Sequence, residues 1–240
     1  MLRCLSGILG YRISAVDGEV GKVHDFYFDD VEWIVRYVVV EAGSLLNRNR
    51  VLISPAMVGQ PDWKEQVLPI SLTVEQVKTS PEVDTDKPVS RQQEQAIAAA
   101  YAMMPHWVPD AVVPVPLTPR HPVLPEPAKG DAHLRSAKHV TGYRIHASDG
   151  DLGHVDDFIA DDECWSIQYI AVATGEWLPG RKVLVAPRWI ESISWDAREV
   201  TVNLSREGVK RSPEYDPTAP INREYEVRLY DYYGRPKYWE

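Results

Sequence analysis

Apolar and polar residues alternate along several short stretches of this chain, and a period of two is typical of β-strands. Residues 22–30 alternate between two faces, and residues 33–43 are dense in the β-branched and aromatic residues that strands favour. Near the end, Val200, Val202 and Leu204 point one way and the polar residues between them point the other. These patterns predict short strands over most of the chain.

The strands are expected to follow one another through tight turns. Asp17-Gly18 lies between two β-rich runs and is a strong signal for a hairpin turn. Gly21 follows closely, where we expect a β-bulge or a close approach of another backbone segment. Five or six short antiparallel strands in about 75 residues favour a small closed meander barrel, because closure removes exposed strand edges.

A helix is predicted after the strands. Asn222 suits the N-cap position of a helix, and Gly234 suits its end. The residues that share one face of this helix are Tyr225, Leu229, Tyr232 and Tyr233. The matching helix earlier in the chain, 95–104, is richer in alanine and has Ser90 as its capping residue. We therefore expect one helix after each set of strands.

The chain repeats itself with a single offset of 132 residues. Between residues 10–55 and 142–187, 21 of 46 aligned positions are identical without a gap. The motif residues of the first repeat are Gly10, Tyr11, Asp17, Gly18, Gly21 and Asp25, and those of the second are Gly142, Tyr143, Asp149, Gly150, Gly153 and Asp157. This similarity predicts tandem duplication of a unit of about 105 residues. We expect a first barrel with its helix over 1–107, a linker over 108–131 and a second barrel with its helix over 132–240.

The segment between the repeats is rich in proline. Eight prolines lie from Pro105 to Pro127. Because proline fixes φ and donates no backbone hydrogen bond, we expect a semi-extended spacer rather than a helix or an inner strand. A docking segment for a proline-recognising domain is the alternative interpretation.

Composition argues against several classes of partner. The 240-residue chain carries a formal net charge of −9, whereas nucleic-acid binding needs a concentrated basic surface. No apolar run approaches the roughly 20 residues of a membrane span, and the start lacks the pattern of a signal peptide. The two cysteines, Cys4 and Cys164, are not at equivalent positions and indicate neither a repeated disulfide nor a metal site. We expect a cytoplasmic protein without a cofactor.

The repeated carboxylates are the first candidates for chemistry. The acidic residues that recur at the offset of 132 are Asp25, Asp29 and Asp30, and Asp157, Asp161 and Asp162. They follow or end a predicted strand, where Asp is favoured because it bonds its own backbone, so a turn or a solvated surface is the favoured interpretation. Weak binding of a divalent cation by Asp29, Asp30, Asp161 and Asp162 stays open, as does acid–base chemistry. No histidine pair, nucleophile motif or phosphate loop is present, so no catalytic residue is assigned and no enzyme is expected.

Aromatic residues are the better candidates for a binding surface. Trp33 and Trp165 occupy equivalent positions and are expected in the core. Trp177 has no aromatic counterpart and lies in a loop, where it suits an exposed anchor for another protein. For the helix tyrosines Tyr232 and Tyr233, together with Trp239, two arrangements stay open: packing on a barrel within the chain, or packing across a homodimer.

The repeated motif resembles the PRC-barrel family. The resemblance rests on Gly-Tyr-x-Ile, on Asp-Gly-x-x-Gly-x-Val-x-Asp-Phe and on the Val-Leu-Ile/Val-x-Pro strand that ends at Pro55 and Pro187. This domain occurs in the cytoplasmic part of the photosynthetic reaction centre H subunit and in a ribosome maturation factor. The C-terminal extension is similar to a tail of bacterial two-copy members. The resemblance implies small β-barrels that act as scaffolds or partner-binding modules.

The sequence as a whole predicts a mainly β protein with two small antiparallel PRC-type barrels, each followed by an α-helix. We expect the pair to pack as an intramolecular pseudo-dimer and to act as a non-catalytic scaffold that binds another protein. Two alternatives stay open. One is an accessory protein related to the reaction centre H subunit and electron transfer, and the other is a weak metal- or ligand-binding module that uses the acidic turns.

Overall fold

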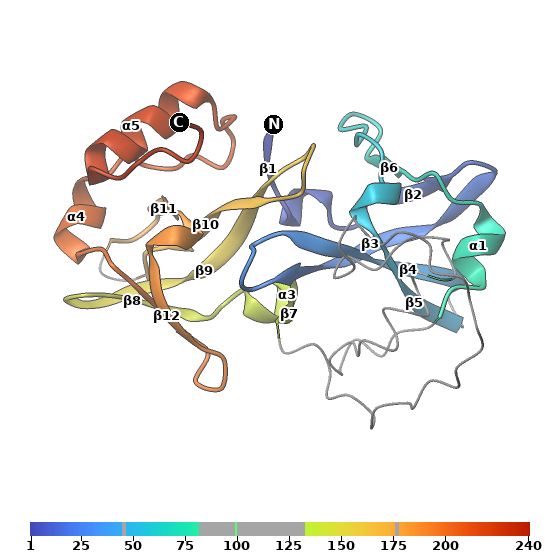
Figure 1. The fold of residues 1–240 in the computed structure, drawn as a ribbon, viewed down its shortest axis with the longest axis horizontal. Helices are drawn as coiled ribbons and strands as arrows, with labels where there is room; N and C mark the ends of the chain where they lie inside the picture. The colour runs from blue at the N-terminus through green and yellow to red at the C-terminus, as the bar shows by residue number, and fades with distance from the viewer. Residues whose placement is uncertain (45–46, 82–98, 100–132, 176–177) are drawn as a thin grey trace, which may run out of the picture. The chain divides into compact units, whose positions relative to one another are not determined.

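The structure is a computed structural model, and it describes residues 1–44, 47–81, 99, 133–175 and 178–240 (Figure 1). The predicted proline-rich linker, the predicted helix at 95–104 apart from Ala99, and the loop residue Trp177 lie outside the described residues.

The elements of the first repeat are short strands joined by turns and 3-10 helices. They are β1 (Leu2–Cys4), η1 (Ser6–Ile8), β2 (Arg12–Ala15), β3 (Gly18–Asp29), β4 (Val35–Ser44), β5 (Asn47–Ile53), η2 (Pro55–Met57), β6 (Val67–Pro69) and α1 (Val74–Lys78). Those of the second repeat are β7 (Leu134–Ser136), α3 (Ala137–Val140), β8 (Arg144–Ala147), β9 (Gly150–Asp161), β10 (Ile167–Ala173), β11 (Lys182–Val185), η4 (Pro187–Trp189), β12 (Ile190–Ser194), β13 (Glu199–Val202), α4 (Arg206–Arg211) and α5 (Arg223–Tyr233). The prediction of a mainly β protein is confirmed, and several elements keep the offset of 132 in their bounds.

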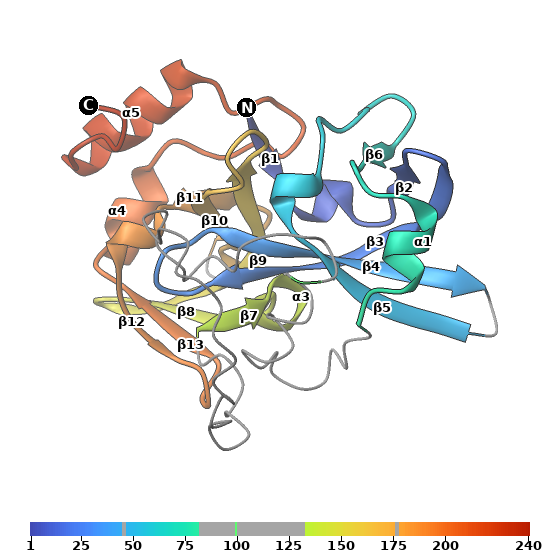
Figure 2. The same ribbon diagram turned by 45° about the vertical axis from the view of Figure 1, so that its right-hand side comes forward.

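Two sheets contain these strands. One has the order β11-β10-β9-β8-β13-β12 with β1 added to β9, and the other has the order β5-β4-β3-β2-β6 with β7 added to β3. Figure 2 shows β8, β12 and β13 lying together. The pairings of the described residues do not close either sheet into the expected barrel, because each path ends at two different strands.

The prediction of wholly antiparallel strands is wrong at one place in each sheet. β2 runs parallel to β6, and β8 runs parallel to β13. A parallel pair needs a crossover instead of a tight turn. In the first repeat, η2 and the loop after it provide this connection, since they carry the chain from β5 to the far side of β2.

The described chain forms two compact units, and neither is one continuous stretch. The first contains residues 1–9, 25–36 and 135–240, and the second contains residues 10–24 and 37–134 as far as these are described. The first unit therefore combines segments of both sequence repeats.

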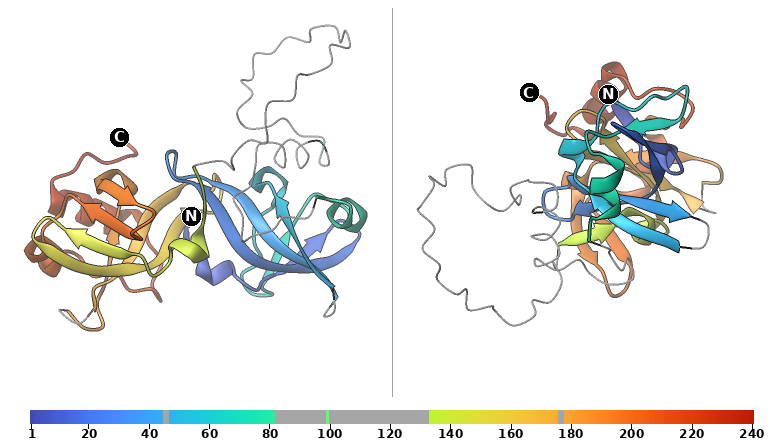
Figure 3. Two further views of the ribbon diagram at one scale, coloured as in Figure 1. Left: turned by 90° about the horizontal axis from the view of Figure 1, so that it is seen from below. Right: turned by 90° about the vertical axis from the view of Figure 1, so that its right-hand side faces the viewer.

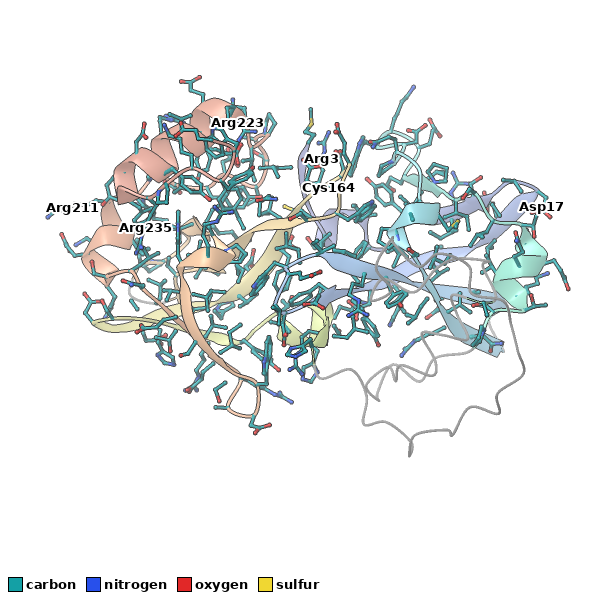
Figure 4. All side chains as sticks on the ribbon, viewed as in Figure 1. Arg3, Asp17, Cys164, Arg211, Arg223 and Arg235 are labelled. Carbon is teal, nitrogen blue, oxygen red and sulfur yellow. The ribbon has the colours of Figure 1, made fainter. Side chains whose placement is uncertain are left out.

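The hairpins at the start of each repeat are confirmed, with the loop shifted by one residue. Ala15 pairs with Gly18, so the loop residues are Val16 and Asp17 rather than Asp17-Gly18. Asp17 has a second role, because its carboxylate accepts a hydrogen bond from the amide of Val74 at 2.7 Å, at the start of α1 (Figure 4). In the second repeat, Asp149 accepts from the amide of Arg206 at 2.7 Å, at the start of α4. The repeated aspartate thus joins each hairpin to a helix.

Gly21 and Gly153 are required by close backbone approach, as the sequence predicts. A Cβ atom on Gly21 would lie 2.1 Å from the carbonyl oxygen of Glu41, and one on Gly153 would lie 2.0 Å from that of Ala173. The register of each hairpin also shifts near these glycines, between Ile13 and Ser14 in the first. Both predicted features, the bulge and the close approach, are therefore present.

The remaining motif residues build each unit's core and its turns. Gly10 and Gly142 have φ of 81° and 90°, a left-handed conformation that favours glycine. In the second unit Tyr11 packs against Trp63 with ring centroids 6.0 Å apart, and in the first unit Tyr143 packs against Trp195 at 6.1 Å. These positions are structural.

Helix α5 begins and ends where the sequence predicts. Asn222 accepts a hydrogen bond from the amide of Tyr225 at 2.9 Å, and Gly234 ends the helix with φ of 59°. The predicted packing face is correct in part. Leu229 is buried as expected, whereas Tyr232 is 40% exposed and Tyr230, which is outside the predicted set, is buried. Tyr230 is buried because the aromatic residues after the helix fold back onto it. The periodicity within the helix does not predict that contact.

Candidate functional site

The first unit is held together by an exchange of short strands between the sequence repeats. β1 of the first repeat pairs antiparallel with β9 of the second, through Leu2↔Asp161 and Cys4↔Ile159. Reciprocally, β7 of the second repeat adds to β3 of the first. We call this arrangement the strand exchange. Figure 1 shows β1 beside β9, and the length and curvature of β9 are clearest in Figure 3. The exchange brings the turn after each short strand to a buried aspartate of the other repeat.

Asp157 binds the segment that follows β1. Its Oδ1 atom accepts hydrogen bonds from the amides of Phe158 at 2.8 Å and Ser6 at 3.1 Å. Its Oδ2 atom accepts a hydrogen bond from the hydroxyl of Ser6. The side chain is buried, and this burial raises the pKa of Asp157 above its ordinary value although the hydrogen bonds work in the opposite direction.

Asp25 binds the end of β7 and the segment that follows it in a similar way. Its Oδ1 atom accepts from the amides of Phe26 at 2.7 Å and Lys138 at 3.1 Å, and its Oδ2 atom accepts from the hydroxyl of Ser136 at 2.5 Å. Lys138 and Ser6 differ by the repeat offset, so equivalent amides reach equivalent carboxylates. The expectation that Asp25 lies on a turn or a solvated surface is wrong, since it is only 5% exposed. Both faces of this part of β3 are covered. The carboxylate accepts three hydrogen bonds from protein groups in place of those it would accept from water.

A cavity of about 170 Å³ lies between these two segments. The side chains that define its character are Leu5, Leu9, Phe26 and Phe158, together with Asp25 and Asp157. The walls are therefore mainly apolar, with two carboxylates from equivalent positions of the two repeats. This combination of an apolar cavity and a few convergent polar groups is typical of a small-molecule site.

Asp29 and Asp161 form the acidic turns that the sequence predicts. Asp29 accepts hydrogen bonds from the amides of Val31 at 2.9 Å and Glu32 at 3.0 Å, and from Arg36 at 3.1 Å. Burial acts to raise the pKa of Asp29, but these three donors outweigh it and the pKa is lowered. Asp161 accepts from two amides of its own turn in the same manner, and its pKa is also lowered despite burial.

Asp30 and Asp162 bind arginines of the exchanged strands. Arg135 of β7 donates to Asp30 at 2.7 Å. Arg3 of β1, which is labelled in Figure 4, has its guanidinium 3.6 Å from the carboxylate of Asp162. Among the residues that the structure describes, no group of three or more His, Cys, Asp and Glu side chains is arranged to hold a metal ion. The second acidic group therefore faces amides and guanidinium groups of the first unit.

The two acidic turns are joined directly to each other. Trp33 and Trp165 adopt the left-handed conformation, with φ of 56° and 59°. The amide of Val35 donates to the carbonyl of Trp165 at 2.9 Å, and the amide of Ile167 donates to the carbonyl of Trp33 at 2.7 Å. Such φ values are unusual for aromatic residues, so the surrounding contacts must fix these turns.

Aromatic side chains of β3 pack against the tryptophans of the two turns and against an aromatic side chain of β9. Phe28 stacks on Trp33 with centroids 5.4 Å apart and contacts Phe158 of the other repeat at 5.1 Å. Trp165 stacks on Phe26 at 5.9 Å. Trp165 is buried as predicted, whereas Trp33 is only half-buried.

The exposed positions of the two turns differ although their backbones correspond. Val31 is 65% exposed and Ile34 is 37% exposed, whereas the equivalent residues are Glu163 and Ser166. Sequence reasoning missed this difference because it compared the identical positions of the repeats. The substitutions between the repeats carry the signal.

The predicted partner residues of the C-terminal region lie in an aromatic cluster of the first unit. Trp239 packs edge-on against Tyr230 at 5.2 Å and lies under the guanidinium of Arg223 at 4.1 Å. Tyr233 contacts Trp189 at 5.0 Å. Of the two arrangements left open by the sequence, these contacts are of the kind expected for packing within the chain.

Glu226 is a buried carboxylate that sequence reasoning missed. It accepts hydrogen bonds from the hydroxyls of Tyr169 at 2.8 Å and Tyr238 at 2.7 Å, and it pairs with Arg223 at 3.0 Å. The hydroxyl of Tyr238 ties the residues after α5 to the helix. The cluster is a closed structural network.

The two cysteines lie in different environments. The sulfur of Cys4 is 3.0 Å from the hydroxyl of Tyr215, and burial raises the pKa of the thiol to about 11. Cys164 is exposed in the turn after Asp161 (Figure 4). No disulfide joins the two.

No family model matches this chain, and no curated protein matches it either. Within the described residues, no helix combines the length and the apolar character needed to cross a membrane.

Proposed function

We propose that this protein is a non-catalytic scaffold that resembles the PRC-barrel family and arose by tandem duplication of one unit. We propose further that it binds another protein through the turn of residues 30–34. The offset of 132 in both sequence and element bounds supports the duplication. The strand exchange supports the view that the repeats pack as an intramolecular pseudo-dimer.

The assignment as a non-enzyme is supported by how the repeated carboxylates are used. Asp25 and Asp157 each hold two backbone amides and one hydroxyl, and Asp29 and Asp161 each hold the amides of a turn. A carboxylate that accepts hydrogen bonds from otherwise unpaired buried backbone donors stabilises the fold, and this use of the repeated aspartates supports a structural role. Both thiols are unpaired, in accord with a cytoplasmic setting.

One observation carries the partner-binding proposal: the first turn exposes Val31 and Ile34 where the second turn has Glu163 and Ser166. The backbone of the first turn is fixed at Trp33 by its stacking on Phe28, so little conformational entropy is lost on binding. Apolar side chains beside a half-buried tryptophan are the usual components of a protein interface.

The partner is a protein with an apolar contact surface bordered by basic residues. The chain has a net charge of −9, and Glu32 is exposed between the two apolar side chains of the turn. Complementary charge around an apolar contact increases the association rate and selects the partner.

The test is affinity capture from native lysate with three forms of the full chain. The first is wild type, the second is the double variant Val31→Glu/Ile34→Ser, and the third is Glu163→Gln/Ser166→Ala as a matched control. The double variant transplants residues that the second turn already accommodates, so folding should be preserved. We expect a protein retained by wild type and the control to be lost by the double variant. Capture of the same proteins by all three forms, or of none, would contradict the proposal.

A further inference from the structure

The cavity between Asp25 and Asp157 has the size of a small organic molecule. Its volume is about 170 Å³. An apolar cavity of roughly 150 Å³ accommodates benzene in another protein, and a water molecule occupies about 30 Å³ of liquid. The space therefore suits a ligand of about eight non-hydrogen atoms.

The walls select for an apolar body. Leu5, Phe26 and Phe158 are buried side chains that line the cavity, and Leu9 lines it while partly exposed. Burying the carbon surface of a ligand against such walls is favourable by about 25 cal/mol per Å². A bare metal ion would gain nothing from these walls, and within the described part of the chain no three His, Cys, Asp or Glu side chains are arranged to hold one.

The two carboxylates select for a positively charged head. In each of Asp25 and Asp157, the Oδ2 atom accepts one hydrogen bond, from a serine hydroxyl, among the described residues. A carboxylate oxygen offers two acceptor positions, so each aspartate retains capacity for one donor from a ligand. Burial of Asp157 disfavours its charged form, and a cation in the cavity would restore the balance.

The charged groups at the rim do not supply that cation directly. Lys138 gives its backbone amide to Asp25 and carries an exposed side chain. Asp156 also lines the cavity and pairs with Lys182 at 2.6 Å. The aromatic rings of Phe26 and Phe158 add a favourable environment for an organic cation through their π faces.

We propose that this cavity binds a small primary ammonium ion with an apolar or aromatic body. The ammonium donates to Asp25 or Asp157, and the body occupies the space between the leucine and phenylalanine side chains. This inference goes beyond the proposed scaffold function and does not depend on the partner protein.

The experiment measures binding of benzylammonium to the purified full chain at neutral pH, by calorimetry and by the shift in melting temperature. Benzyl alcohol serves as the neutral probe of the same shape. We expect saturable binding of benzylammonium and at least about tenfold weaker binding of the alcohol, since only the cation compensates the carboxylates. Equal affinity for both probes, or no saturable binding of benzylammonium at about 10 mM, would overturn the proposal.

Two variants assign the binding to the cavity. Leu9→Trp fills the space from a partly exposed position and should abolish binding, whereas Ser192→Trp adds the same bulk on exposed β12 and should leave it unchanged. Thermal melts establish that each variant is folded. Retention of benzylammonium binding by a folded Leu9→Trp variant would place the ligand elsewhere and refute the assignment. Because these measurements need no partner protein, their failure is separate from failure of the capture experiment.

Discussion

The guanidinium of Arg135 donates to the carboxylate of Asp30 at 2.7 Å, although 105 residues separate them in the sequence. Asp30 is almost fully buried, and Arg135 also stacks over the ring of Trp195 at 4.1 Å. This ion pair joins β7 to the residue that follows β3. Its contribution to stability therefore reports on the strength of the strand exchange.

Replacement Arg135→Met should lower the free energy of unfolding by about 2 kcal/mol, because it removes a guanidinium that donates to a buried carboxylate. Urea denaturation measures this change. The same substitution in an Asp30→Asn background should cost clearly less, which isolates the pairwise interaction. Arg144→Met on an exposed position of β8 is the control and should change stability little. Additive effects of Arg135→Met and Asp30→Asn would argue against the interaction.

Gly153→Ala should prevent folding or destabilise the first unit by about 3 kcal/mol or more, because the new Cβ would lie 2.0 Å from the carbonyl oxygen of Ala173. Circular dichroism melts report the change. Gly7→Ala is the matched control in the same unit, since its nearest contact would be the Cβ of Cys4 at 4.0 Å. A Gly153→Ala protein that melts like wild type would show that the close approach is absent.

Asp157 and Asp29 should have opposite effects on the pH dependence of stability. Burial raises the folded pKa of Asp157, so its contribution is present below the unfolded value of about 3.9 and is lost as the pH rises through the folded pKa. The pKa of Asp29 is lowered, so its contribution is present above the unfolded value and is lost as the pH falls through the folded pKa.

The measurement is the free energy of unfolding between about pH 2.5 and pH 7 for wild type, Asp157→Asn and Asp29→Asn. Relative to wild type, Asp157→Asn should gain stability as the pH rises, and Asp29→Asn should lose it. Parallel curves for the two variants would mean that burial and the turn amides do not act as described.

The two isolated repeats should not fold as independent monomers. Residues 132–240 alone lack β1, which pairs with β9, and lack Phe28, which contacts Phe158. Separately produced fragments 1–107 and 132–240 should give poorly dispersed NMR spectra or self-associate, and mixing them should restore a native spectrum. A monomeric 132–240 fragment with cooperative melting and native stability would contradict this expectation.

The two thiols should react at very different rates with a disulfide reagent at pH 8. Burial raises the pKa of Cys4 to about 11, so little of it is thiolate, whereas Cys164 is exposed. Absorbance should show one fast and one slow thiol, and Cys164→Ser should remove the fast phase alone. Two fast thiols in the folded protein would be inconsistent with the burial of Cys4.

Local features were predictable from the sequence, and the strand exchange was not. The caps of α5 at Asn222 and Gly234, and the close approach at Gly21, depend on residues whose conformational needs are intrinsic. The hydrogen-bond partner of Asp25 could not be predicted in this way. Because the repeats carry the same motif, β1 would present an equivalent amide to Asp25 as β7 does, so the sequence does not distinguish pairing within a repeat from pairing between repeats.

The candidate cavity could not be predicted from the sequence for the same reason. Asp25 appears in an alternating strand pattern, which predicts one covered face and one solvated face. Its burial arises because a segment 111 residues away places Ser136 against it. The packing face of α5 was likewise decided by Tyr238 and Trp239, which follow the helix and fold back on Tyr230.

Cys4 and Ile159 face each other in the paired strands although they are far apart in the sequence. The first of these strands is therefore synthesised well before the second. A ribosome that adds roughly 5–20 residues per second needs about 8–30 s to make the intervening chain. During that interval β9, the native neighbour of β1, does not yet exist. The pairing therefore leaves β1 without its partner strand until β9 has been synthesised.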